Sequence, residues 1–173
     1  MADRIEYEPR EFIASEQAIR GADYALTLKA NGAVIKGGIT TGPTADKIQI
    51  FQWEKKVASQ RSASSGLASG RRIHFPMNFI GPMSQAGPLI FKAICNNDVV
   101  EGTLDCWAAP GTGERVIIYT VTFSKARIDS YAVLSSPLDG SFCYNFSIVA
   151  QAITETFTDG GIEHHDEWSG QSA

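Results

Sequence analysis

Between residues 117 and 123, apolar and polar side chains alternate, and this pattern constrains the fold more than any other part of the sequence. The apolar members of the run are Ile117, Tyr119, Val121 and Phe123. A spacing of two places them on one face of a strand, so the run predicts a strand that is buried on one side. A second short strand is predicted over residues 127–133, almost without a turn. Two strands joined by so sharp a bend indicate the corner of a barrel or sandwich.

Further strands and one helix complete the predicted fold. Strand patterns recur over residues 24–28, 47–58, 72–80, 99–107, 115–124 and 142–157. The one helix predicted in the body begins near Pro88, a residue suited to a first helical turn, and ends at Cys95. The sequence therefore predicts a mainly β protein: a closed or nearly closed β-barrel of two packed antiparallel sheets with one flanking α-helix.

Size and composition fit a single globular domain. The 173 residues are 43% hydrophobic and 20% charged, which is ordinary for a chain with its own core. The apolar runs are too short to cross a bilayer, so no direct insertion into a membrane is expected. Charged residues stand near the N-terminus where a signal peptide needs apolar ones, so classical export is not expected. The cysteines Cys95, Cys106 and Cys143 are widely spaced and odd in number, which predicts reduced thiols.

Charge is distributed unevenly along the chain, whose net charge is -4. The segment 55–72 contains basic residues and no acidic one, whereas the segment 128–173 contains acidic residues and neither Lys nor Arg. Opposite charges at two places on one chain can complement each other between copies. Such a contact is heterologous, and it generates rings or open stacks.

The candidate interface lies where this charge is concentrated. Residues 59–70 are small and polar, which predicts a long loop between two strands. The candidate interface residues on the loop are Ser59, Gln60, Arg61, Ser62, Ser64, Ser65, Gly66, Leu67, Gly70, Arg71 and Arg72. The predicted acidic partner face consists of Asp159, Glu163, Asp166 and Glu167.

Motifs for catalysis or cofactor binding do not stand out. The segment 42–47 lacks the second glycine and the Ser/Thr of a phosphate-binding P-loop, and no Gly-x-Ser-x-Gly elbow occurs. His164 and His165 are adjacent, which is poor geometry for one metal ion. The basic segment has no aromatic residue between Lys56 and Arg71, unlike a single-strand nucleic-acid surface. We therefore expect no catalytic residue, no metal, no cofactor and no nucleic-acid partner.

Several segments together resemble a known family, the haemolysin-coregulated (Hcp) tube proteins of bacterial type VI secretion systems. The main match is the pattern Tyr119-x-Val121-x-Phe123-x-x-Ala126-x-Ile128-x-Ser130-Tyr131. Other residues in the family's order are Phe79, Pro88-Leu89-Ile90 with Ala93 and Cys95, Thr103-Leu104-Asp105, and Ile50-x-x-Trp53. The resemblance covers residues 23–157. The segment 81–88 departs from it, because it is longer and lacks the family's acid and base.

The resemblance implies a phage-tail-tube-like barrel that forms homohexameric rings, which stack into a hollow tube. A contractile sheath and a spike protein would be partners, and the lumen would carry effector proteins. The loop over residues 59–70 would reach the next ring. The protein would be structural, not an enzyme, and would leave the bacterial cytoplasm by injection into target cells without a signal peptide. Polar strand positions such as Thr27, Thr120, Thr122 and Asn145 are candidates for the lumen wall.

The expected organisation is an N-terminal extension over residues 1–22, an Hcp-like barrel over 23–158 and an acidic C-terminal tail over 159–173. Two alternatives remain open on the sequence. One is the tube subunit of a phage-like tail or of an extracellular contractile injection particle. The other, from a different class, is a monomeric ligand-binding barrel or a small hydrolase, which would need a convergent polar pocket.

Overall fold

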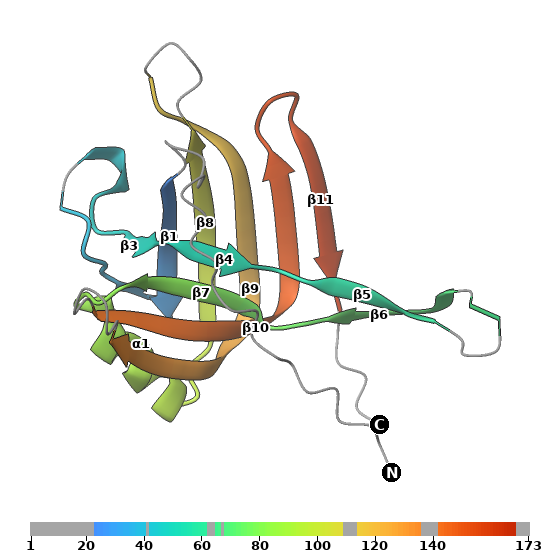
Figure 1. The fold of residues 1–173 in the computed structure, drawn as a ribbon, viewed down its shortest axis with the longest axis horizontal. Helices are drawn as coiled ribbons and strands as arrows, with labels where there is room; N and C mark the ends of the chain where they lie inside the picture. The colour runs from blue at the N-terminus through green and yellow to red at the C-terminus, as the bar shows by residue number, and fades with distance from the viewer. Residues whose placement is uncertain are drawn as a thin grey trace.

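A computed structural model describes residues 23–40, 42–61, 65–66, 68–108, 114–135 and 142–168 (Figure 1). Its elements are β1 (Asp23–Ala30), β2 (Ala33–Ile35), the 3-10 turn η1 (Gly42–Thr44), β3 (Ile48–Ile50), β4 (Gln52–Glu54), β5 (Val57–Arg61), β6 (Ala68–His74), β7 (Met77–Pro82), α1 (Ala86–Cys95), β8 (Val100–Ala108), β9 (Val116–Ser135), β10 (Phe142–Phe157) and β11 (Ile162–Glu167). The predicted extension over residues 1–22 lies outside the described residues. None of the helices in the described part is long and apolar enough to span a membrane.

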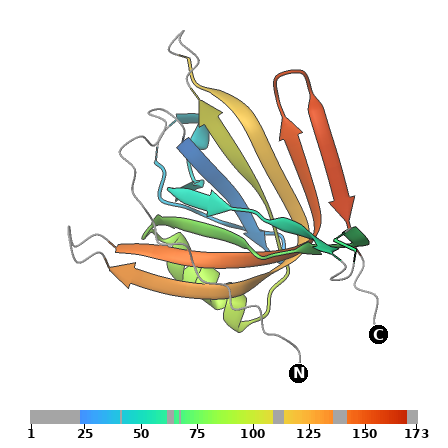
Figure 2. The same ribbon diagram turned by 45° about the vertical axis from the view of Figure 1, so that its right-hand side comes forward.

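One nine-stranded antiparallel sheet forms the body, in the order β2-β1-β8-β9-β10-β7-β4, with β11 on β10 and β3 on β1. Residues 48–54 bring the two edges of this sheet together, because β3 pairs with β1 and β4 pairs with β7. Between them, the Phe51 N–H donates to the Ile80 carbonyl at 2.7 Å. The sheet is thus nearly closed (Figure 2), and the mainly β fold with one α-helix in the described part confirms the predicted class.

The two packed layers of the barrel are halves of this one sheet, because the long strands β9 and β10 bend and run through both. β9 is a single 20-residue strand paired with β10, where the sequence predicted two short strands joined by a corner. The corner itself is present as a bend near Lys125, whose φ of 51° lies in the left-handed region. That conformation is uncommon for a residue with a side chain and redirects the strand.

The bend shifts the buried face of both strands by one residue. On β9, the buried side chains nearest Lys125 are Phe123 before it and Ala126 after it. On β10 the equivalent buried pair is Ala150 and Ile153, at the same level of the sheet. Both strands therefore turn together, so the same sheet covers two sides of one core.

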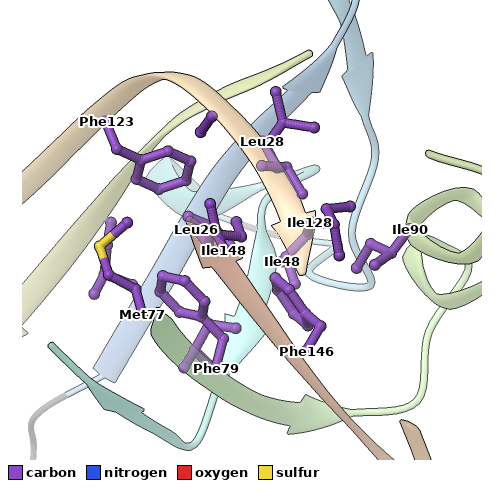
Figure 3. Packing of buried hydrophobic residues seen from close by; sticks show 14 of the residues in the cluster. Leu26, Leu28, Ile48, Met77, Phe79, Ile90, Phe123, Ile128, Phe146 and Ile148 are labelled. Atoms are coloured by element: carbon purple, nitrogen blue, oxygen red, sulfur yellow. The ribbon is translucent and has the colours of Figure 1, made fainter. Parts of the chain in front are cut away.

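The core is built from the alternation that the sequence displays. Tyr24, Leu26 and Leu28 share a face of β1, and both leucines are fully buried. Large buried side chains from β1, β3, β7, β9, β10 and α1 meet in the centre (Figure 3). Phe79 and Phe146 stack there with ring centroids 5.3 Å apart. These side chains fill the interior of the barrel.

The helix α1 lies against β9 and has the predicted extent within two residues. Pro88 falls in its first turn, and Ile90 and Ala93 point into the core. The helix stops because the next residues make a turn, in which Asn97 has a φ of 56°.

The predicted strand over residues 47–58 is divided into β3, β4 and the start of β5, with breaks at Phe51 and at residues 55–56. Likewise, the predicted strand over 72–80 is interrupted at Phe75 and Pro76, since proline has no N–H for a sheet ladder.

Candidate assembly surface

A hairpin made of β5 and β6 forms a separate two-stranded sheet that extends away from the body (Figure 1). Ser59 faces Arg72 in its register, and the Phe75 N–H donates to the Lys56 carbonyl at 3.0 Å and closes the base. The register shifts next to Ser59, and Gly70 on the partner strand has a φ of 94°. Glycine reaches that conformation without strain, so the bulge can form there. We call residues 57–74 the arm.

The arm contains the described part of the predicted interface loop. Ser59, Gln60 and Arg61 lie in β5; Gly70, Arg71 and Arg72 lie in β6; and Ser65 and Gly66 are exposed between the strands. Ser62, Ser64 and Leu67 lie outside the described residues. The sequence located this segment, but its prediction of a loop over all of residues 59–70 was wrong. Strands paired only with each other need no buried alternation, so their small polar residues read as loop.

The predicted acidic residues lie on or beside β11. Asp159 is exposed in the turn after β10, and Glu163 accepts a hydrogen bond from the Thr156 hydroxyl at 3.1 Å. Glu167 pairs with Lys125 at the corner of β9. Glu163 and Glu167 belong to a strand that is hydrogen-bonded along β10, although the sequence was interpreted there as a tail.

Asp166 is the acidic residue that meets the arm. The Arg72 guanidinium donates two hydrogen bonds to the Asp166 carboxylate. Nε donates to Oδ2 at 2.5 Å, and Nη2 donates to Oδ1. The Nε2 of His74 lies 2.8 Å from the same Oδ2. The Arg72 hydrogen bonds, assisted by His74, lower the pKa of the Asp166 carboxyl. The basic and acidic segments therefore meet within one chain at this point, where the sequence led us to expect a contact between copies.

An aromatic stack backs this carboxylate. The ring of His74 lies on the indole of Trp168, with centroids 3.7 Å apart and planes 9° apart. Trp168 is itself fixed, because its backbone N–H donates to the Gln151 carbonyl at 2.9 Å and its side chain packs against the core. Asp166, Arg72, His74 and Trp168 are called the latch below. Its pairing could not be read from the sequence, because 94 positions separate Arg72 from Asp166.

A second contact anchors the base of the arm. The Lys55 ammonium, just before β5, pairs with Glu155 of β10. Tyr119 also interacts with Glu155. Burial is the larger cause of the raised pKa of the Tyr119 phenol, and the Glu155 carboxylate is the next. Trp53 stacks on Tyr119, with centroids 6.3 Å apart.

The buried charge and thiol of the body are structural. Asp105 is 6% exposed and pairs with Lys47 at 2.6 Å. Burial, and then the Asp105 charge, raise the pKa of Cys106 to about 12, so its thiol is a poor nucleophile near neutral pH. Cys95, Cys106 and Cys143 are free in the structure.

The outer face of the sheet carries a polar row that crosses five strands. Thr27, Thr103, Thr122, Thr154 and His165 are aligned across β1, β8, β9, β10 and β11. The Thr103 and Thr122 hydroxyls lie 3.2 Å apart, and the Thr154 hydroxyl lies 2.8 Å from the Nδ1 of His165. Thr120 is on the same face, whereas Asn145 lies opposite Ile80 of β7 in the other half of the sheet. Of the residues proposed for a lumen wall, Thr27, Thr120 and Thr122 therefore belong to one surface.

Within the described residues, no group of three or more His, Cys, Asp or Glu side chains is placed to hold a metal ion. His164 and His165 follow each other in β11, so they point to opposite faces of the strand. The features that stand out are a projecting arm, the latch at its root and a polar sheet face.

A comparison of the sequence with curated proteins gave no match. The family described as "Type VI secretion system effector, Hcp" matches residues 27–158. That match includes the arm, the corner of β9 and all of β10.

Solved structures share the fold over most of the chain. The Hcp1 protein from E. coli EAEC 042, solved as a mutant, has a TM-score of 0.79 and 21% identity, covering 85% of this chain and 99% of its own. Another Hcp protein has a TM-score of 0.78 and 16% identity, with 86% and 98% covered. The secreted protein Hcp3 from Pseudomonas aeruginosa has a TM-score of 0.69 and 13% identity, with 86% and 99% covered. By its sequence match, supported by this shared fold, the chain belongs to the Hcp family of type VI secretion system effectors.

Proposed function

We propose that this chain is the tube subunit of a type VI secretion system. Six copies form a ring, and rings stack head to tail into a hollow tube inside a contractile sheath and beneath a spike protein. The family match over residues 27–158 supports this function, as does the fold shared with Hcp proteins.

The single observation that carries the proposal is the arm. Its strands pair only with each other, and a lone two-stranded hairpin is marginally stable in water. Val57 and Ile73 lie on its opposite faces and are 43% and 38% exposed. These apolar side chains are available to be buried against another molecule, which would remove apolar surface from water. In our proposal that molecule is a second copy of this chain in the neighbouring ring.

The polar row supports a role for the opposite surface. Threonine hydroxyls keep this face polar and hydrated, which suits a wall that effector proteins must enter and leave without binding tightly. We assign Thr27, Thr120 and Thr122 to the lumen wall on this basis. Effectors are then partners held in the lumen.

The interior of the barrel argues against a monomeric ligand-binding function. A ligand-binding barrel encloses a cavity, whereas here Leu26, Phe79, Phe123 and Phe146 fill the centre (Figure 3). The proposed role is accordingly structural, without catalysis. The protein is made in the bacterial cytoplasm and leaves the cell when the sheath contracts.

Size-exclusion chromatography with multi-angle light scattering tests the proposal. Across a wide concentration range, we expect a species of six chains and larger multiples of six. Monomer alone at every concentration would contradict the proposed function.

A further inference from the structure

The arm is joined to the body by few contacts. Neither of its strands hydrogen-bonds into the nine-stranded sheet, and the chain enters and leaves it through the short links at residues 55–56 and 75–76. Such a hairpin can swing about its links unless side chains hold it. Side chains that hold it include Lys55, which pairs with Glu155, and the latch between β6 and β11.

The latch is built to fix a direction. A bidentate guanidinium–carboxylate pair is planar, so the Arg72 guanidinium and the Asp166 carboxylate hold each other in a defined orientation and tie β6 to β11. His74 approaches the same carboxylate from the next position on its face of β6 and is only 9% exposed. Its stack on Trp168 fixes the plane of the imidazole. Two side chains of β6, Arg72 and His74, thus hold the arm against Asp166 and Trp168.

We infer that Asp166 is a positioning residue for assembly: through Arg72 and His74 it sets the direction in which the arm leaves the body, and so the geometry of ring stacking onto a second copy of this chain. The inference rests on the proposed function, because it takes the arm as the stacking contact. In this inference, β11 sets the direction of the arm, whereas the arm itself contacts the next ring.

The latch also pairs one positive charge of the basic segment, Arg72, within the chain itself. Arg72 and Asp166 neutralise each other inside the chain, so neither presents a free charge to a neighbouring ring. The intermolecular role predicted for the basic segment then falls on the rest of the arm. Because Asp166 is on the outermost strand and outside the core cluster, its loss should leave the barrel intact.

The test compares Asp166→Asn with Asp46→Asn in the full chain. Asp46 makes an exposed ion pair with Lys36 at 3.4 Å, and asparagine tolerates its φ of 63°, so this control removes one charge of an ion pair far from the arm. Hydrogen exchange of the amides in residues 57–61 and 68–74 reports how firmly the arm is held. Electron microscopy reports the length of the stacks.

We expect Asp166→Asn to exchange about tenfold faster in the arm, with β8 and β9 unchanged, and to form shorter stacks. The control should match the wild type in both measurements. The charge swap Arg72→Asp with Asp166→Arg should restore part of the protection and of the stack length, which a merely destabilised variant would not do.

Arm exchange equal to that of the wild type in Asp166→Asn would overturn the latch as a positioning device. Faster exchange with stacks of unchanged length would overturn its role in stacking. A wild-type protein that forms no rings or stacks would instead overturn the proposed function, and the exchange data would still decide whether Asp166 holds the arm.

Discussion

His74 of the arm lies flat on Trp168 beyond the end of β11, with ring centroids 3.7 Å apart and planes 9° apart. This stack joins a hairpin with no sheet partner in the body to a side chain that packs on the core. The arm is therefore held against the body by side chains and not by sheet hydrogen bonds.

Replacing Trp168 with alanine should lower the free energy of unfolding by about 2 kcal/mol, because the change removes the stack and part of an apolar contact. Trp168→Phe retains a ring and should recover most of the loss. Urea denaturation followed by circular dichroism measures both values. Equal stability of the alanine variant and the wild type would show that the stack contributes nothing.

The latch should weaken in acid. Arg72 first, and His74 after it, lower the pKa of Asp166 below its ordinary value of 3.8, and His165 and Glu167 on β11 face the other side of the strand. A carboxyl with a lowered folded-state pKa contributes stability above its unfolded pKa, and that contribution is lost as pH falls through the folded value. The stability difference between wild type and Asp166→Asn should therefore be full at pH 7 and shrink below about pH 4. Urea unfolding of both proteins at several pH values measures it; a difference that grows in acid would contradict this assignment.

The bend of β9 should depend on the backbone at Lys125. Both Lys125→Gly and Lys125→Val remove the pair with Glu167, so comparing them isolates the effect of φ. Glycine adopts a positive φ freely, whereas a β-branched residue is strained there, so we expect the glycine variant to be more stable by about 1–2 kcal/mol. Thermal and urea unfolding give the comparison. A valine variant as stable as the glycine variant would mean that the corner does not require this conformation.

The core should respond to loss of a stacked ring. Phe146 is fully buried and packs on Phe79, so Phe146→Ala should destabilise the barrel by about 3–5 kcal/mol. Phe146→Leu fills more of the space and should lose less. The measurement is the free energy of unfolding in urea, and a loss below about 1 kcal/mol for alanine would be inconsistent with the packing described.

Reversing Arg61 and Arg71 to glutamate tests the charge of the arm while leaving Arg72 in the latch. We expect shorter stacks with rings intact, and we expect high salt to have a similar effect on the wild type, because exposed charges are screened. Stacks of unchanged length in the double variant, seen by electron microscopy, would show that these charges do not contribute to the stacking contact.

Much of the fold could be predicted from the sequence because its core follows simple alternation. The extents of β10 and α1 and the buried face of β1 agree with the apolar spacing, since burial on one side leaves that pattern in a strand. The corner was visible because apolar residues resume at a shifted phase after Lys125. What the spacing could not distinguish was a bend within one strand from a turn between two.

The edge of the sheet and the latch escaped prediction for physical reasons. β11 is polar and mostly exposed, so the acidic residues there read as a tail. One signal was present: Asp159-Gly160-Gly161 precedes it, and both glycines have a positive φ, as hairpin turns require. The pairing of Arg72 with Asp166 depends on how the closed sheet places two distant segments, which no local pattern encodes.

Electron microscopy of the purified full chain shows whether the chain builds tubes. We expect rings of uniform diameter with six-fold symmetry that stack into hollow tubes at high concentration. Fields of single small particles, or aggregates without a constant diameter, would contradict the assignment of this chain as a tube subunit.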